Sequence, residues 1–142
     1  MASKSELKLW EEKQKEIIKI FKKKELRPDL QMLKARVMGY SYAGFLHREL
    51  KEIEEDIAKW PFKQYLDEEL LTHIEQLDEE EKKVVIAKYG IGKDGIYISS
   101  KDASEISGIS SRKIPHINKR AIAKLEEIYR EYRSNKKNSL SL

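Results

Sequence analysis

Hydrophobic residues recur at helical spacing along most of the chain. In the segment 5–26 they lie opposite a face of Lys and Glu, at Leu7, Trp10, Ile17, Ile18 and Phe21. Pro28 interrupts this pattern, because the residue before a proline avoids the helical region, and a shorter helix is expected over 29–38. The glycine-flanked segment 39–44 is expected to form a loop or hinge.

Two more helices are expected in the middle of the chain, over 45–60 and 65–76. The first has apolar residues spaced by four, three, four and three positions, at Leu46, Leu50, Ile53, Ile57 and Trp60. This is the seam of a helix that packs against another helix. The seam can build a homodimer, or it can pack onto the C-terminal part of its own chain. We interpret the aromatic residues Trp10, Trp60 and Phe62 as packing residues rather than as a platform on which bases stack.

Capping signals define the elements that follow. Asp78 and Glu81 have the spacing of a capping box, which predicts a helix that runs to about Tyr89 and ends at Gly90. Ser99 or Ser100 can cap a short helix that ends near residue 107. The turn 108–110 then leads into a last helix with an apolar stripe at Ile114, Ile117, Ala121, Leu125 and Ile128.

Pro115 leaves two alternatives for the start of this last helix. If Ser110 or Ser111 is the cap, the proline lies inside the helix, where it removes a hydrogen bond and bends the axis. If the helix begins at Pro115, a favoured first position, the residues before it form an irregular turn. A short helix, a glycine-containing turn and a second helix with a basic start form a helix-turn-helix pattern. In the second alternative the basic residues precede the helix, and they would then not fit a DNA groove as this pattern requires.

Composition favours an all-α fold and excludes several classes of protein. Of the 142 residues, 39% are hydrophobic and 38% are charged, and there are six Gly and three Pro. No cysteine is present, and His47, His73 and His116 are scattered, so neither a disulfide framework nor a metal site is expected. No apolar run approaches the length of a membrane span or a signal peptide, so we expect a cytoplasmic protein that does not contact membranes. The carboxylates lack a convergent His or Ser, and no enzyme and no cofactor are expected.

Charge is segregated along the chain. Residues 1–48 carry 12 Lys and Arg and 6 Asp and Glu, residues 49–81 carry 3 and 13, and residues 82–142 carry 14 and 6. Clustered Lys and Arg gain free energy by releasing counterions from nucleic-acid phosphates, so the two basic ends predict a polyanionic partner. Lys22, Lys23, Lys24 and Arg27 form either a second DNA patch or an ordinary solvated helix face.

Within the segment 74–128, two motifs carry a resemblance to a known family. The stretches "IEQLDEEEKKVVIAKYGI" and "GISSRKIPHINKRAIAKL" resemble the first helix and the turn with recognition helix of region 4, the promoter-binding domain of bacterial sigma factors. The N-terminal 60 residues do not resemble the sigma region that melts promoter DNA. In layout the chain looks most like phage or prophage late-gene regulators of the ArpU and RinA type. The resemblance implies promoter DNA and RNA polymerase as partners.

The resemblance also implies which residues contact DNA. The groove-facing positions of the family fall on Ser111, Arg112, Pro115 and His116, and Lys113 and Lys119 are placed for phosphates. Lys88 and Lys101 would flank the groove and contact the DNA backbone. Ser110 and Arg120 complete the set of candidate DNA-binding residues. The chain departs from the family at Pro115, which removes one base contact, and at Ser107, where the family often has an apolar residue.

The sequence therefore predicts a helical N-terminal arm over 1–63, a sigma region 4-like DNA-binding domain over 64–133 and a disordered tail over 134–142. The leading hypothesis is a sequence-specific DNA-binding transcription regulator. Two alternatives remain open. One is a DNA-packaging factor that resembles a small terminase subunit, and the other is an interaction protein that binds RNA polymerase or an anti-sigma partner without reading bases.

Overall fold

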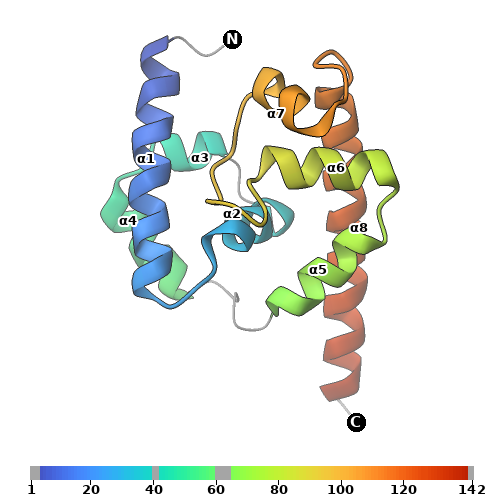
Figure 1. Ribbon diagram of the computed structural model, residues 1–142. Coiled ribbons are helices and arrows are strands. Elements are labelled where there is room, and N and C mark those ends of the chain that lie inside the picture. The colour runs from blue at the N-terminus through green and yellow to red at the C-terminus, as the bar shows by residue number, and fades with distance from the viewer. Residues whose placement is uncertain (1–3, 40–41, 60–64, 141–142) are drawn as a thin grey trace.

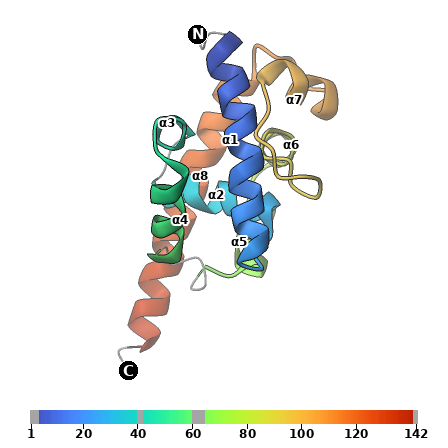
Figure 2. The ribbon, with the colours of Figure 1, turned by 90° about the vertical axis from the view of Figure 1, so that its left-hand side faces the viewer.

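The computed structural model describes residues 4–39, 42–59 and 65–140, and within these ranges the protein is all-helical, as the sequence predicts. The helices are α1 (Lys4–Lys23), α2 (Pro28–Val37), α3 (Tyr42–Leu46), α4 (Leu50–Lys59), α5 (Asp67–Glu75), α6 (Glu79–Lys88), α7 (Ser100–Ser107) and α8 (Ile114–Leu140). Helices α1 and α4 form one side of the molecule and the long helix α8 forms the other, with α2 between them (Figure 1). Helix α7 and the beginning of α8 lie at the same end (Figures 1 and 2).

One hydrophobic core joins the N-terminal helices to the C-terminal ones. Its buried members come from α1 to α6 and from α8, and they include Trp10, Phe21, Leu33, Ile53, Leu70, Ala121 and Leu125. A smaller cluster connects α6, α7 and α8 through Val84, Ala87, Ala103, Ile114 and Ile117. The described parts of the segments 1–63 and 64–133 therefore share a core, and the N-terminal helices pack onto the C-terminal part of their own chain.

Polar side chains hold the connection between α6 and α7 against the N-terminal helices. Gln14 is buried, and its Oε1 accepts a hydrogen bond from the backbone N–H of Tyr97 at 2.6 Å. The Asp29 carboxylate accepts from the N–H of Gly92 at 3.1 Å. Gly95 lies so close to α2 that a Cβ there would approach Asp29 N to 2.7 Å, and its φ of 76° also favours glycine. The turn-rich segment after α6 is thus fixed to α1 and α2.

The prediction of one helix over 45–60 and of a loop over 39–44 is wrong in part. Helix α3 already begins at Tyr42, and the chain leaves the helical conformation after Leu46 before α4 begins at Leu50. The Lys13 ammonium on α1 donates to the backbone carbonyls of Leu46 and Arg48, and these bonds stabilise the break. Trp60 and Phe62 lie outside the described residues, so their predicted packing role stays a prediction.

Helix α8 also continues further than predicted. A disordered tail was expected from Ser134, but the backbone is helical through Leu140. Among the residues whose side chains are described, the half-buried Tyr132 is the last that packs against the core. No Gly or Pro follows it before residue 140, so added residues propagate the existing helix without a new nucleus.

Candidate nucleic-acid interface

Local capping positions α6 and α7 as the sequence predicts. The Asp78 side chain accepts from Glu81 N at 2.9 Å, and the Glu81 side chain accepts from Asp78 N at 3.0 Å, which completes the capping box of α6. The Ser99 hydroxyl accepts from the N–H of Asp102 and caps α7. Helix α7 ends at Gly108, whose φ of 74° lies in the left-handed region.

The last helix begins later than expected for a cap at Ser110 or Ser111, the alternative that places Pro115 inside the helix. The regular helix starts at Ile114, which places Pro115 at its second position. Ser110 O accepts from the N–H groups of Lys113 and Ile114, so the residues before the helix form a hydrogen-bonded turn. The regular helix thus begins later than a cap at Ser110 or Ser111 predicts and close to the second alternative, although the bond from Ile114 N–H to Ser110 O already has the i→i−4 spacing of a helix. A proline in the first turn costs no ladder bond, because that N–H has no partner within the helix.

Buried isoleucines orient the first turns of α8. Ile114 is 0% exposed and Ile117 is 4% exposed, and both pack against α6 and α7. The residues between and around them therefore point outward, since side chains three or four positions apart share one face of a helix. Exposed positions include most of the predicted DNA-contacting residues: Ser110, Ser111, Arg112, Lys113, Pro115, His116 and Lys119, with Lys101 exposed on α7.

Helix α7 packs through one small side chain. Ala103 is its buried residue, whereas Ile106 is 51% exposed. Ser107 stands where the resemblance to sigma region 4 implies an apolar residue, and the neighbouring Ile106 does not take that place in the core. The α7 helix is accordingly anchored less deeply than α6 and α8.

Lys88 does not lie where the sequence analysis expects it. Its side chain is 6% exposed, its ammonium donates to Ile98 O at 2.7 Å, and it lies 4.3 Å from the centre of the Tyr97 ring. Burial lowers the pKa of Lys88 to about 8. The predicted phosphate contact of Lys88 is therefore corrected: the side chain turns inward, because the segment after α6 supplies both an acceptor and an aromatic face.

Arg120 also has a structural partner that the sequence analysis does not predict. Its Nε donates to Oε2 of Glu81 at 2.8 Å, and Lys124 Nζ donates to the other carboxylate oxygen at 2.8 Å. Arg120 lies 3.6 Å from Asp78 and 3.9 Å from Glu80 as well. Arg120 is thus occupied by the acidic first turn of α6 and is corrected from a DNA contact to an internal one. The sequence signal for this role is the four-residue spacing of Arg120 and Lys124, which puts two cations on one helix face.

Hydrogen bonds control the ionisation of Glu81. Its side chain is 0% exposed, and burial by itself would raise its pKa. The donors on Lys124, Asp78 and Arg120 outweigh that effect and lower the pKa of Glu81 to about 2. The buried carboxylate is therefore ionised at neutral pH and links α6 to α8.

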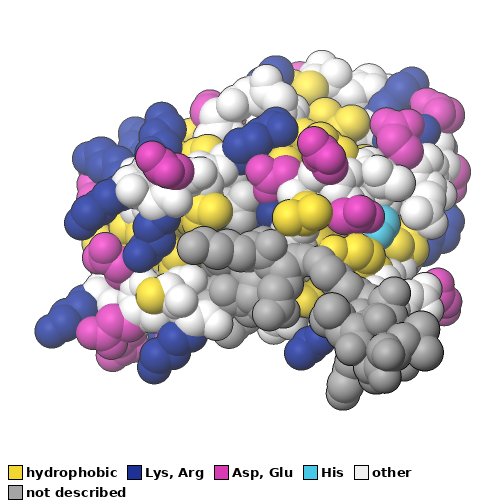
Figure 3. Space-filling model, turned by 90° about the horizontal axis from the view of Figure 1, so that it is seen from below, with side chains coloured by type: hydrophobic (Ala, Val, Ile, Leu, Met, Phe, Trp, Pro, Cys, Tyr) yellow, Lys and Arg dark blue, Asp and Glu magenta, His cyan; other side chains and the backbone are white. Residues whose placement is uncertain are grey.

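The second basic patch lies away from the start of α8. Lys22, Lys23, Lys24 and Arg27 are exposed at the end of α1, which is opposite to the end that carries α7 and the start of α8 (Figures 1 and 2). Lys23 lies 3.8 Å from Glu54, and Arg27 pairs with Asp29 at 2.8 Å. In the view from below, Lys and Arg gather on the side of α1 and α4 but are mixed with Asp and Glu (Figure 3). This patch fits a solvated helix face.

Within the described residues, no helix has the length and apolar character needed to cross a membrane, and no cluster of three or more His, Asp or Glu could hold a metal ion. Comparison of the chain with protein-family models, with curated proteins and with solved structures finds no match. Function is therefore inferred from the arrangement of the chain's own residues.

Proposed function

We propose that the protein is a sequence-specific DNA-binding transcription regulator in which α7, the turn at Gly108 and α8 form a helix-turn-helix. The observation that carries the proposal is the exposed polar and basic surface at the start of α8, which includes Arg112, Lys113, His116 and Lys119. Among the described residues, no acidic side chain forms an ion pair with Arg112, Lys113 or Lys119, whereas Arg120 and Lys124 are paired. Free cations that surround a buried anchor are suited to a phosphate-lined groove.

The roles of the individual residues follow from the groove chemistry. The Arg112 guanidinium has the geometry to pair with guanine O6 and N7, and His116 can donate to a base acceptor. Lys113 and Lys119 contact phosphates and set the orientation of the helix without reading sequence. Pro115 presents no hydrogen-bonding group to a base. We further propose promoter DNA as the target and bacterial RNA polymerase as the protein partner, as in late-gene activators of phages and prophages.

The packing of the N-terminal helices supports a regulator over a packaging factor. A small-terminase-like factor needs helices that assemble subunits into a ring. Here the apolar faces of α1, α2 and α4 are used inside one chain, through residues such as Ile17, Leu33 and Ile53. These side chains are fully buried, so they are not available for a neighbouring subunit.

Footprinting on the protein's own genomic neighbourhood, with and without RNA polymerase, tests the proposal. We expect a protected site next to a promoter that persists in the presence of competitor DNA. Equal protection of all sequences would contradict base readout and favour the interaction protein. A ring-sized assembly in light scattering, with no promoter footprint, would favour the packaging factor.

A further inference from the structure

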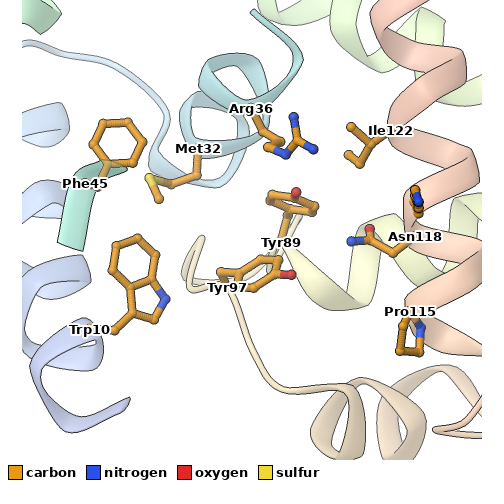
Figure 4. A pocket seen from close by; sticks show the side chains of 10 residues that line it. Trp10, Met32, Arg36, Phe45, Tyr89, Tyr97, Pro115, Asn118 and Ile122 are labelled. Atoms are coloured by element: carbon orange, nitrogen blue, oxygen red, sulfur yellow. The ribbon is translucent and has the colours of Figure 1, made fainter. Parts of the chain in front are cut away.

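A cavity of about 280 Å³ separates the N-terminal helices from the beginning of α8 (Figure 4). Trp10 from α1 and Phe45 from α3 form one end, and Pro115 and Asn118 from α8 form the other. Tyr89 and Tyr97 lie between the two ends (Figure 4). The volume is close to the lower limit for small-molecule sites, which are mostly apolar with a few placed polar groups.

The aromatic walls favour a flat occupant. The Tyr89 and Tyr97 rings meet edge to face, with centroids 5.0 Å apart and planes inclined by 60°. The Lys88 ammonium, 4.3 Å from the Tyr97 centroid, supports that ring from outside the lining of the cavity. Rings held in this way offer both faces and edges to a planar aromatic molecule.

The charged groups in the lining favour an anion. Arg36 and Lys119 both line the cavity, and none of the described residues that line it is acidic. Arg36 uses Nη1 for Glu126 at 3.1 Å, but a guanidinium has five N–H donors and can hold a second carboxylate. Its positive charge reaches the Tyr89 hydroxyl, where it opposes the rise in the pKa of Tyr89 that burial causes.

Asn118 adds a requirement for a hydrogen-bond donor. Its side chain hydrogen-bonds to the Tyr89 hydroxyl, whereas its Oδ1 is shielded from solvent and has no hydrogen-bond partner among the described residues. A buried amide oxygen without a donor costs free energy, so an occupant that supplies an N–H or O–H gains the bond that the protein lacks. The amide of Asn118 lies on the Tyr89 side of α8 (Figure 4).

We propose that this cavity binds a small planar aromatic carboxylate that carries a ring N–H or hydroxyl donor. The rings of Tyr89 and Tyr97 hold the aromatic plane, Arg36 pairs with the carboxylate and Asn118 accepts from the donor. The inference goes beyond the proposed function and does not depend on DNA binding. Because Pro115 and Lys119 line the cavity, the occupant contacts the same helix that we propose enters the major groove.

Calorimetric titration of the full chain without DNA tests the site, with indole-3-carboxylate as the probe. We expect saturable one-to-one binding. Indole lacks the carboxylate and 1-methylindole-3-carboxylate lacks the N–H donor, and we expect both to bind at least about tenfold more weakly. These comparisons use the unaltered protein, so they stand even if a variant misfolds. An absence of saturable binding, or equal affinity for the three compounds, would overturn the proposal and leave a cavity filled by water.

Two variants locate the site. Arg36→Met should weaken indole-3-carboxylate binding at least about tenfold while it leaves the affinity for indole nearly unchanged. Asn118→Leu should abolish the preference for indole-3-carboxylate over its N-methyl derivative. Arg130→Met, which removes the same charge from an exposed position of α8, is the matched control and should bind like the wild type. Unchanged affinity and selectivity in the first two variants would place the ligand elsewhere.

Discussion

Arg120 on α8 donates from Nε to the buried carboxylate of Glu81 on α6, at 2.8 Å. The same carboxylate completes the capping box with Asp78. The Glu81 side chain therefore both caps the N-terminus of α6 and fixes α8 against this helix. The contact lies near the small cluster formed by Val84, Ile117 and neighbouring apolar residues. The orientation of the proposed recognition helix thus depends on an ion pair as well as on apolar packing.

Glu81→Gln should destabilise the protein at neutral pH by about 2 kcal/mol, because it leaves Arg120 and Lys124 without their buried partner. Glutamine can still complete a capping box, so the loss reports the charge rather than the cap. The pKa of Glu81 is about 2 in the folded protein and 4.5 in the reference state. Its contribution is therefore present above pH 4.5 and is lost as the pH falls toward 2.

Urea denaturation of wild type and Glu81→Gln between pH 7 and pH 2.5 measures this contribution. The difference in unfolding free energy should shrink as the pH falls. Glu79→Gln, on the exposed side of the same turn, is the control and should change the free energy little. A difference that is independent of pH would show that Glu81 acts through shape alone.

Lys88 should make the protein more stable as the pH rises from 8 to 10. Its pKa is about 8 in the folded state and 10.5 in the reference state. Between these values the folded protein has released a proton that the unfolded chain retains, so the unfolding free energy increases with pH, by on the order of 3 kcal/mol over the full interval. Below pH 8 both states are protonated and the contribution is constant.

Chemical denaturation at several pH values between 8 and 10 tests this for wild type and Lys88→Met. The variant should lose most of the rise with pH. Lys83→Met, which changes an exposed lysine of the same helix, should retain it. Parallel curves for wild type and Lys88→Met would mean that Lys88 is solvated in solution.

The contrast between the helix caps and the buried Lys88 shows which features of the fold the sequence can predict. The capping roles of Asp78 and Ser99 depend on residues three positions away, so local spacing predicts both. The burial of Lys88 depends on Tyr97 and Ile98, in a segment whose position is set by Gln14. That arrangement exists only after distant parts of the chain pack, so the sequence predicts an exposed Lys88 side chain instead. The cavity near Asn118 has the same origin, since it joins residues of α1, α2, α3 and α8 with the connection between α6 and α7.

If Arg112 makes the proposed bidentate contact to guanine, Arg112→Ala should reduce affinity for the cognate site by about 1 to 3 kcal/mol and relax the preference at one base pair. Binding to a library in which each base pair of the footprint is varied measures both effects. Arg130→Ala removes an exposed arginine further along α8 and is the matched control. Equal weakening on all sequences would contradict base readout by Arg112.

Lys119→Ala should weaken binding to all DNA sequences to a similar extent. A phosphate contact contributes through counterion release, so the slope of log K against log salt concentration should fall in magnitude by about one. Titrations at several salt concentrations, on cognate and on unrelated DNA, measure this slope. A wild-type slope in the variant would mean that Lys119 does not contact phosphate.

Pro115→Ala should leave stability almost unchanged. In the structure the proline is the second residue of α8, where an N–H would have no partner within the helix. Alanine also gives the unfolded chain more conformational freedom, so the expected change is a loss of less than about 1 kcal/mol. If the proline interrupted a helix that began at Ser110 or Ser111, its removal would instead stabilise the protein by about 3 kcal/mol. The unfolding free energy of the variant in urea distinguishes the two cases, and such a stabilisation would show that α8 begins before Ile114 in solution.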